Sequence, residues 1–279
     1  MISLENVSKK FGTGVFAISD VSFSVEKGEF VFLIGPTGSG KTTIFRLLIR
    51  EMLPSQGKVV VNSWDVVKLP GRKIPELRKK IGVIFQDLKL LNDRTILENT
   101  TLPLEVVGTK KKDAIAQAME ILNQVGILEH KDKFPVQLSG GELQRAAIAR
   151  ALILSPDILL ADEPTGNLDD VTSWEIVKLL SDINEKGTTV VMATHNHEII
   201  KKLNKRVIEL NKGEMVNDKK GHKSSAKQNS EEKKEEKKTN SAKPDTVQNL
   251  AKQNSDDEEK VENNNDKEVK TDDFEEALK

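Results

Sequence analysis

Residues 31–45 read VFLIGPTGSGKTTIF, an apolar run followed by a glycine-rich loop and then by helix-forming residues. The loop from Gly35 to Thr42 fits the pattern G-x-x-x-x-G-K-[ST], and it lies between an expected strand and an expected helix. In such a loop, backbone N–H groups and the helix N-terminus hold phosphates, Lys41 reaches the β- and γ-oxygens, and the Thr42 hydroxyl ligates magnesium. The stretch therefore predicts a nucleotide-binding α/β fold.

Short apolar runs recur along the chain, at 81–85, 158–161 and 190–193. Continuous apolar runs are typical of parallel strands that are buried on both faces, and such sheets bind ligands at the carboxyl ends of their strands. Helical patterns lie between the runs, at 42–51, 113–125 and 142–154. The alternation predicts a mainly parallel core sheet with helices packed against it.

Composition divides the chain near residue 216. Residues 217–279 hold 14 Lys against 17 Asp and Glu, in blocks such as EEKKEEKK. They contain too little apolar area to offset the entropy of ordering, so we predict a disordered charged tail; a short amphipathic partner-binding helix at its end, TDDFEEALK, is the alternative. Residues 1–216 are predicted to form one nucleotide-binding domain, with a helical subdomain inserted at about 87–155.

The start of the chain predicts an antiparallel sheet. It is formed from ISLENVS and VSFSVEKGEF, with a turn at Lys27-Gly28. Residues 1–216 are nearly neutral in charge, which argues against nucleic acid as the main ligand. The chain has no cysteine, which excludes disulfides and thiolate metal sites and favours the cytosol. No apolar run approaches the length of a membrane span, so we expect that any membrane role depends on a partner.

Polar residues at the ends of the apolar runs are candidates for catalysis. Asp162 ends one run and can hold magnesium, and Glu163 beside it can polarise a water for attack on the γ-phosphate. Gln86 and His195 follow other runs and can hydrogen-bond the γ-phosphate or the water on the metal. A solvated acid at a strand end is the alternative for Glu163, and a hydrogen-bonded surface residue is the alternative for His195.

A second helix start, LSGGELQR at 138–145, also has the features of an anion site. Ser139 and Glu142 have the spacing of a capping box, which explains a stable helix N-terminus. Gly140 and Gly141 are costly in a first helical turn and suggest close approach of a ligand to the backbone. Since the phosphates already have one helix, we expect a second copy of the chain to present this N-terminus to the γ-phosphate across a dimer interface.

Taken in order, these motifs resemble the ATP-binding cassette (ABC) ATPases. GPTGSGKT resembles Walker A, Gln86 the Q-loop, LSGGE the signature, ILLADE Walker B, residues 167–169 the D-loop and His195 the switch histidine. The resemblance implies an ABC-type P-loop NTPase and a head-to-tail dimer with two ATP molecules between Walker A of one chain and the signature of the other. Two departures are Thr42 in place of serine and Asp170-Val171 where proline is commoner.

The resemblance also assigns roles to individual residues. Catalysis falls to Glu163 and His195, and Mg²⁺ contacts fall to Thr42, Gln86 and Asp162. Phe11, where tyrosine is commoner, is assigned to stacking on adenine. The nucleotide contacts that it implies are Phe11, Gly35, Pro36, Thr37, Gly38, Ser39, Gly40, Lys41, Thr42, Thr43, Gln86, Ser139, Gly140, Gly141, Glu142 and Asp169.

Within the family, residues 1–216 are most similar to the ATPases of bacterial cell division. That similarity implies a membrane subunit resembling FtsX, a peripheral location on the cytoplasmic face of the membrane at the division site, and indirect control of cell-wall hydrolases. The alternatives are an ATPase of a transporter or a lipoprotein-release complex, and a nucleotide-gated scaffold with incidental turnover. Leu88, Leu90 and Leu91 are expected to help line the groove for the membrane subunit.

Overall fold

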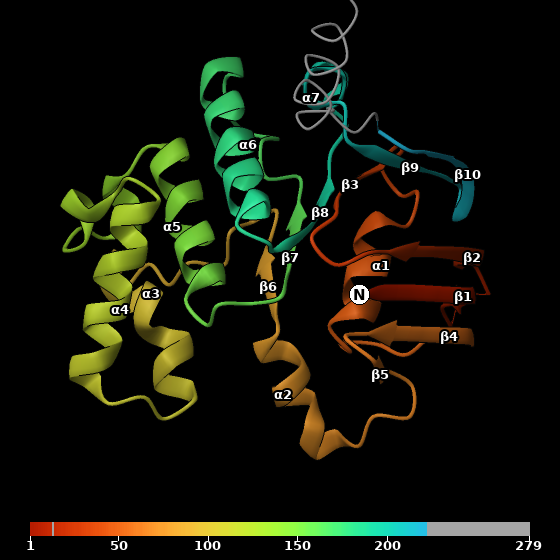
Figure 1. Ribbon diagram of the computed structural model, residues 1–279, viewed down its shortest axis with the longest axis horizontal. Helices are drawn as coiled ribbons and strands as arrows, with labels where there is room; N and C mark the ends of the chain where they lie inside the picture. Colours follow the sequence, from red (N-terminus) through yellow and green to blue (C-terminus); the bar gives the residue numbers. More distant parts are fainter. Residues whose placement is uncertain (13, 222–279) are drawn as a thin grey trace, which may run out of the picture. The chain divides into compact units, whose positions relative to one another are not determined.

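The computed structural model describes residues 1–12 and 14–221. Two β-sheets enclose helix α1 (Lys41–Leu48), and a group of helices lies beside the larger sheet (Figure 1). From residue 222 onward, the predicted disordered tail lies outside the described residues. This part includes its last residues, TDDFEEALK.

The core sheet has six strands, of which five are parallel. In spatial order the strands are β10 (Glu214–Lys219), β9 (Arg206–Asn211), β3 (Phe30–Ile34), β8 (Thr189–Ala193), β7 (Ile158–Asp162) and β6 (Ile81–Ile84). Strands β7 and β8 are buried along their whole length, which explains their continuous apolar sequences. The four apolar runs read from the sequence are therefore confirmed as neighbouring parallel strands.

The smaller sheet is antiparallel, in the order β2-β1-β4-β5. Its strands are β1 (Ile2–Lys10), β2 (Phe16–Val25), β4 (Gln56–Val61) and β5 (Trp64–Asp65). The predicted turn at Lys27-Gly28 does not return the chain to this sheet, because Phe30 and the residues after it pair with β8 and β9 instead. The apolar sequence FVFLI is buried on both faces there, which an edge position in the antiparallel sheet does not provide.

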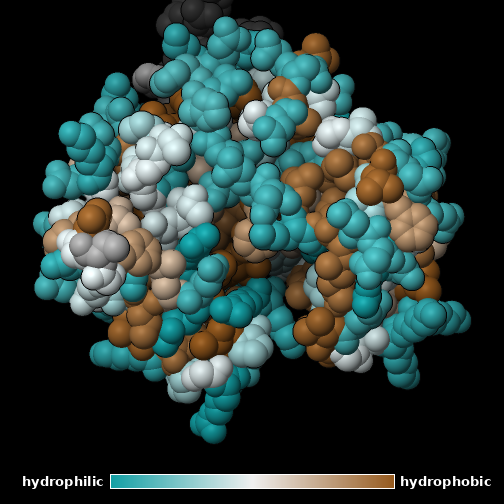
Figure 2. Space-filling view, turned by 180° about the vertical axis from the view of Figure 1, so that it is seen from behind, coloured by the Kyte–Doolittle hydropathy of each residue, from teal (hydrophilic) through white to brown (hydrophobic). Residues whose placement is uncertain are grey.

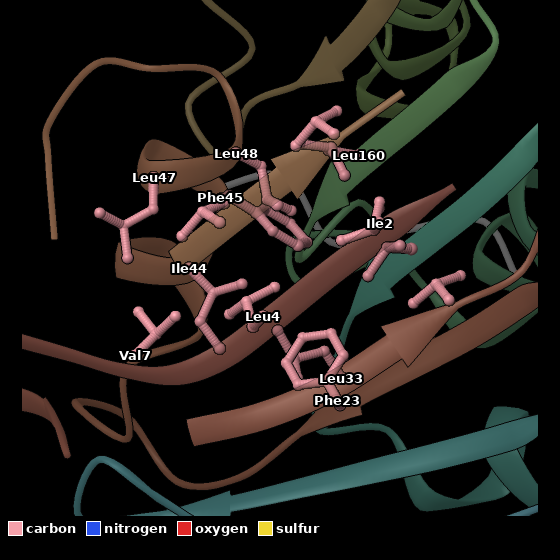
Figure 3. Close-up of a cluster of buried hydrophobic side chains, with 14 of the residues drawn as sticks. Ile2, Leu4, Val7, Phe23, Leu33, Ile44, Phe45, Leu47, Leu48 and Leu160 are labelled. Carbon is pink, nitrogen blue, oxygen red and sulfur yellow. The ribbon is translucent and has the colours of Figure 1, made fainter. Parts of the chain in front are cut away.

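A hydrophobic core joins the two sheets around α1. Ile44 and Leu47 from the helix are fully buried beside Leu4 of β1 and Leu33 of β3 (Figure 3). The helix begins directly after the glycine-rich loop, so this core holds the loop at the carboxyl end of β3. Packing of α1 therefore determines where the phosphate-binding loop lies.

The predicted helical segment contains α3 (Ile96–Val106), α4 (Lys111–Gln124) and α5 (Gly140–Leu152), which pack on one another. Helix α5 starts two residues before the predicted Glu142 because Ser139 caps it. Helix α2 (Ile74–Lys79) precedes β6, and α6 (Asp170–Glu185) and α7 (His197–Leu203) flank β8 in the sequence.

Strand β10 continues three residues beyond the boundary predicted at 216. It pairs with β9, and the Arg206 guanidinium donates to the Asp218 carboxylate at 2.7 Å and to Glu29 Oε1 at 3.0 Å. The predicted tail therefore contributes Asp218 to an ion-pair network of the folded domain.

The surface is mainly hydrophilic, with scattered hydrophobic groups, some of them beside a hollow on the face shown in Figure 2. Exposed hydrophobic side chains include Val106, Val136 and Val171. Within residues 1–12 and 14–221, none of the helices combines the length and apolar character needed to span a membrane.

Candidate active site

The glycine-rich loop connects β3 to α1 in a shape that depends on its glycines. Gly35 has φ 145° and Gly40 has φ 106°, a region that L side chains rarely adopt. A Cβ on Gly35 would lie 2.2 Å from the Leu210 carbonyl oxygen, so β9 packs directly on this turn. Lys41 Nζ donates to the carbonyl oxygens of Gly35 at 2.8 Å and Pro36 at 3.3 Å. Gly35 and Pro36 thus shape the loop and hold its lysine.

A cleft of about 270 Å³ opens beside the loop at the carboxyl ends of the core strands. Residues 37–43 line it together with Gln86 after β6, Asp162 and Glu163 at the end of β7, and His195 after β8. The structure therefore brings together the residues that the sequence predicted from four separate strand ends. Ser39 Oγ is buried here and finds no hydrogen-bond partner among the described residues.

Thr42 and Asp162 form a direct pair at the base of the cleft. Thr42 Oγ1 donates to Asp162 Oδ2 at 2.8 Å. Burial raises the pKa of Asp162, and the nearby Glu163 also raises it, while the hydrogen bond from Thr42 and the charge of Lys41 act in the opposite direction. A hydroxyl and a carboxylate side by side are hard oxygen ligands, the type that Mg²⁺ prefers.

Glu163 has a strained backbone and two charged or polar neighbours. Its φ is 49°, which is unfavourable for a non-glycine residue and typical of functional sites. Its Oε2 lies 2.8 Å from His195 Nδ1, and its Oε1 lies 3.8 Å from Lys41 Nζ. The Glu163 side chain is only 12% exposed, whereas that of His195 is 71% exposed. A carboxylate held in this way at the cleft can accept a proton from a bound water.

The signature turn does not line this cleft. Ser139, Gly140, Gly141 and Glu142 border a second hollow, together with Asp169 and residues of α6. Ser139 caps α5, and its capping box with Glu142 is formed in both directions. The sequence-based capping prediction is thus confirmed, and the two helix N-termini face separate hollows.

Packing against α6 explains why residue 141 is glycine. A Cβ on Gly141 would lie 2.6 Å from Thr172 Cγ2, and a Cβ on Gly140 would lie 3.1 Å from Leu168 Cδ2. The sequence suggested that a ligand approaches this backbone, and contacts within the chain are a second reason. Asp169 accepts from Thr172 N at 2.9 Å and Thr172 Oγ1 at 2.6 Å, so its carboxylate caps α6. These hydrogen bonds lower the pKa of Asp169.

Phe11 lies outside the cleft lining, in the turn between β1 and β2. It is 44% exposed, and Lys9 Nζ lies 5.7 Å from the centre of its ring. Three residues that line the cleft were not among the predicted nucleotide contacts: Ala17, Gly166 and Asn167, of which the sequence placed only Asn167 in a motif, the D-loop. Gly166 and Asn167 follow Glu163 closely and are a recognisable turn, whereas Ala17 comes from β2 and has no local signal.

A groove of about 590 Å³ lies between α2, β6, α3 and α5, and its lining differs from the expectation. Leu88 and Leu90 pack against the core around α5, and Leu91 is 37% exposed outside the lining. None of the three leucines lines this groove, because Leu88 and Leu90 contribute to the core and Leu91 lies elsewhere, and their expected contact with the membrane subunit stays a prediction. Phe85, Lys89, Leu102, Pro103 and Arg150 are among the residues that line it.

Comparisons with known proteins show the family of the chain. The ABC transporter family model matches residues 18–166. The cell division ATP-binding protein FtsE of Bacillus subtilis is 45% identical over 218 residues, which cover 78% of this chain and 96% of the relative. FtsE of Mycobacterium tuberculosis is 49% identical, with 78% and 95% covered.

A solved structure extends the comparison to three dimensions. The dimeric ATP-binding cassette MJ0796, in a post-hydrolysis state bound to ADP and Pi, superposes with a TM-score of 0.74 at 35% identity. The match covers 80% of this chain and all of that chain. With its phosphate loop, strand-end acids and signature turn in the arrangement described above, the chain belongs to the ABC transporter family and is an ATP-binding and ATP-hydrolysing homologue of FtsE.

Proposed function

We propose that the protein is the ATPase subunit of a cell-division complex, and that two copies close head to tail around two ATP molecules. The observation that carries this proposal is the separation of the two helix N-termini into different hollows of one chain. A helix N-terminus with exposed N–H groups favours an anion, and the phosphates in the cleft already have the N-terminus of α1. The signature turn therefore has a role if it meets the nucleotide of a second copy. The dimeric state of the solved cassette supports this arrangement.

The loop and the strand ends supply the binding groups for ATP. Lys41 exchanges its bonds to the loop carbonyl oxygens for phosphate oxygens, and the buried Ser39 hydroxyl is within the same lining. Thr42 and Asp162 would hold Mg²⁺, which would neutralise phosphate charge, and Gln86 lies on the same lining.

Hydrolysis follows from the position of Glu163. A water attacks the γ-phosphorus, its proton passes to the Glu163 carboxylate, and the bond to the β,γ-bridging oxygen breaks to give ADP and phosphate. His195 holds Glu163 through the 2.8 Å contact and presents its exposed ring to the γ-phosphate. Loss of the γ-phosphate removes the anion that joins the two copies, so the dimer reopens.

The membrane subunit, resembling FtsX, binds in the groove between α2, β6, α3 and α5. The lining of the groove includes apolar side chains such as Val83, Phe85 and Leu102, which suit the hydrophobic face of a helix, and the basic side chains Lys79 and Lys89. Through this contact the protein is held at the cytoplasmic face of the membrane at the division site. Opening and closing of the dimer then regulates cell-wall hydrolases across the membrane.

Replacing the catalytic carboxylate tests the proposal. Glu163→Gln removes the proton acceptor but keeps the shape of the side chain, so ATP is expected to trap a dimer that turns over at least a hundredfold more slowly. Sedimentation with ATP measures the dimer, and phosphate release measures turnover. Turnover at the parent rate contradicts the role of Glu163, and a strictly monomeric variant in ATP contradicts the dimer. Normal complex function in a strain whose only copy is Glu163→Gln favours a scaffold instead.

A further inference from the structure

The Glu142 carboxylate of the signature turn is held on both of its oxygens. Its Oε2 accepts from Ser139 N and from Ser139 Oγ, each at 2.7 Å. Its Oε1 lies 2.7 Å from Nε2 of His130, which belongs to the short 3-10 turn Leu128–His130. His130 precedes the signature serine by nine residues and forms no part of the motif. The imidazole nevertheless lies in direct contact with it.

The chemistry of this contact fixes the direction of the hydrogen bond. The hydrogen bonds from Ser139 lower the pKa of Glu142, and the charges of His130 and Lys133 lower it further, so the carboxylate is an acceptor on both oxygens. His130 Nε2 must therefore carry the hydrogen and donate it. His130 Nδ1 is buried and has no hydrogen-bond partner among the described residues. Buried polar atoms without partners are rare in folded proteins. The contact of Nε2 with Glu142 is therefore the polar interaction that orients this ring.

The charges around the signature turn also require that the Glu142 carboxylate be held by hydrogen-bond donors. The hollow there is bordered by three carboxylates, Glu142, Asp169 and Glu175, and by one guanidinium, Arg145, which donates to Glu175 at 2.9 Å. A site of this composition repels phosphate unless each carboxylate keeps its own donors. Asp169 is held by Thr172, as described above. Glu142 depends on Ser139 and His130.

The Ser139 hydroxyl has one proton, and two acceptors need it. In the isolated chain that proton is donated to Glu142 Oε2. To donate to a phosphate of the second copy, the hydroxyl must leave the carboxylate, which then keeps only the Ser139 N–H on one oxygen and His130 on the other. A carboxylate that loses a donor in a closing, water-poor interface is costly. The hydrogen bond from His130 limits that cost.

We propose that His130 is a positioning residue for the signature turn, which holds Glu142 so that the Ser139 hydroxyl is free to bind the phosphate of the second copy. The inference rests on the proposed function, because it needs the head-to-tail dimer. Its consequence is a thermodynamic coupling between His130 and the charge of Glu142 that affects dimer closure and leaves nucleotide binding in the cleft of one chain unchanged.

A double-mutant cycle in the Glu163→Gln background tests this coupling. Sedimentation over a concentration series in ATP and Mg²⁺ gives the dimer dissociation constant of each variant. His130→Ala is expected to weaken the dimer about tenfold, the effect of losing one hydrogen bond to a charged group. Glu142→Gln keeps the capping geometry but has no charge to hold, since glutamine also serves in a capping box. When residue 142 is glutamine, His130→Ala should change the dimer dissociation constant less than twofold.

Two further variants separate positioning from general stability. His130→Gln keeps an N–H donor at a similar reach and should restore the dimer to within about threefold of the parent. Lys133→Ala removes a charge near Glu142 without a hydrogen bond and should have a smaller effect than His130→Ala. Binding of a fluorescent ATP analogue to the monomer and thermal melting report whether each variant is folded with an intact cleft. If His130→Ala does not fold, the same cycle is measured with His130→Gln, whose loss of up to about threefold should disappear when residue 142 is glutamine.

The outcomes are distinguishable. Equal dimer affinity in His130→Ala and its parent overturns the inference and leaves the proposed function standing. An equal loss from His130→Ala with glutamate and with glutamine at position 142 also overturns it, since the effect is then unrelated to the carboxylate. If the Glu163→Gln parent itself stays monomeric in ATP, the dimer is contradicted, and the inference falls with it.

Discussion

Thr172 of α6 packs against Gly141 of the signature turn so closely that a Cβ at position 141 would lie 2.6 Å from Thr172 Cγ2. The Thr172 hydroxyl is fixed by its bond to Asp169, so the methyl group has little freedom to move away. We predict that Gly141→Ala lowers ATP hydrolysis at least tenfold by separating α5 from α6. Adding Thr172→Ser removes the methyl group, keeps the hydroxyl and should recover most of the activity. Phosphate release measures both.

The rescue distinguishes two reasons for a glycine. If residue 141 is glycine only because the nucleotide of a second copy approaches the backbone, then Thr172→Ser has no means of restoring activity. Gly140→Ala is the matched control, because its Cβ would meet the end of the flexible Leu168 side chain at 3.1 Å. Thr172→Ser should not rescue that variant.

His195 contributes through Glu163, and its removal should affect turnover more than binding. His195→Ala leaves the Glu163 carboxylate with Lys41, at 3.8 Å, as its nearby basic side chain. We expect kcat to fall about a hundredfold, a typical loss for a group that assists proton transfer, while ATP affinity changes less than threefold. Steady-state kinetics and nucleotide binding give the two values. His197→Ala, an exposed histidine at the start of α7, is the control and should retain full turnover.

Asp162 is expected to reduce the stability of the nucleotide-free protein. Burial raises its pKa in the folded state, so the folded protein favours the protonated form, and the stabilising contribution of this form is lost as pH rises through the folded pKa. At neutral pH the charge is therefore a cost. Asp162→Asn should raise the melting temperature by about 2–4 °C, as expected for roughly 1 kcal/mol in a domain of this size, while hydrolysis is lost.

The control for this prediction is an acid whose charge is paired. Asp157 accepts from Asn62 at 2.9 Å and lies 3.4 Å from Lys80, so Asp157→Asn should not stabilise the protein. Thermal melts without nucleotide compare the two variants. A lower melting temperature for Asp162→Asn than for the parent contradicts the predicted cost of the buried charge.

The strands and the phosphate site were predictable because their signals are local. A run such as ILLAD predicts a buried parallel strand without knowledge of its neighbours, and the loop from Gly35 to Thr42 carries its chemistry in one short pattern. The rule that ligands lie at the carboxyl ends of parallel strands then correctly grouped Gln86, Glu163 and His195.

Contacts between distant segments had no such signal. Ala17 lines the cleft only because β2 packs beside α1, and Thr172 meets Gly141 only because α6 packs on α5. Strand β10 reads EMVNDK and is mostly exposed or half-buried, so its polar composition resembled the charged tail. Its pairing with β9 and the bond from Arg206 to Asp218 decide its structure.

The Arg206–Asp218 pair should make stability depend on acid pH. Hydrogen bonds and charge from Arg206 lower the pKa of Asp218 in the folded state, so the stabilisation is complete above the ordinary aspartate pKa of ~4. It is lost as pH falls through the lower folded pKa. Chemical unfolding between pH 7 and pH 3 should show a steeper loss of stability in the parent than in Asp218→Asn. Parallel curves contradict the assignment, and the effect is modest because the Asp218 side chain is 31% exposed.

Arg150 connects the signature helix to the segment after Gln86. Its guanidinium donates to the carbonyl oxygens of Leu88 and Lys89, each at 2.5 Å, and both residues have the unfavourable positive φ, 55° and 52°. Burial lowers the pKa of Arg150, so holding a charge there is costly, and the two carbonyl oxygens offset part of that cost. The arrangement ties the last turn of α5 to the strained turn that follows Gln86.

Replacing the forked donor by a single one should loosen this turn. Arg150→Lys keeps the charge but cannot donate to both carbonyl oxygens in the same geometry, so kcat should fall about tenfold as Gln86 loses its fixed position, with ATP affinity within about threefold. Arg78→Lys is the matched control, because Arg78 also donates to two backbone carbonyl oxygens, those of Ile49 and Arg50, at the end of α1. If both variants lose kcat equally, and the loss follows the fall in melting temperature, a specific link from α5 to Gln86 is contradicted. A loss confined to Arg150→Lys supports it, since both substitutions remove the same kind of bond and only Arg150 bonds the segment that follows Gln86.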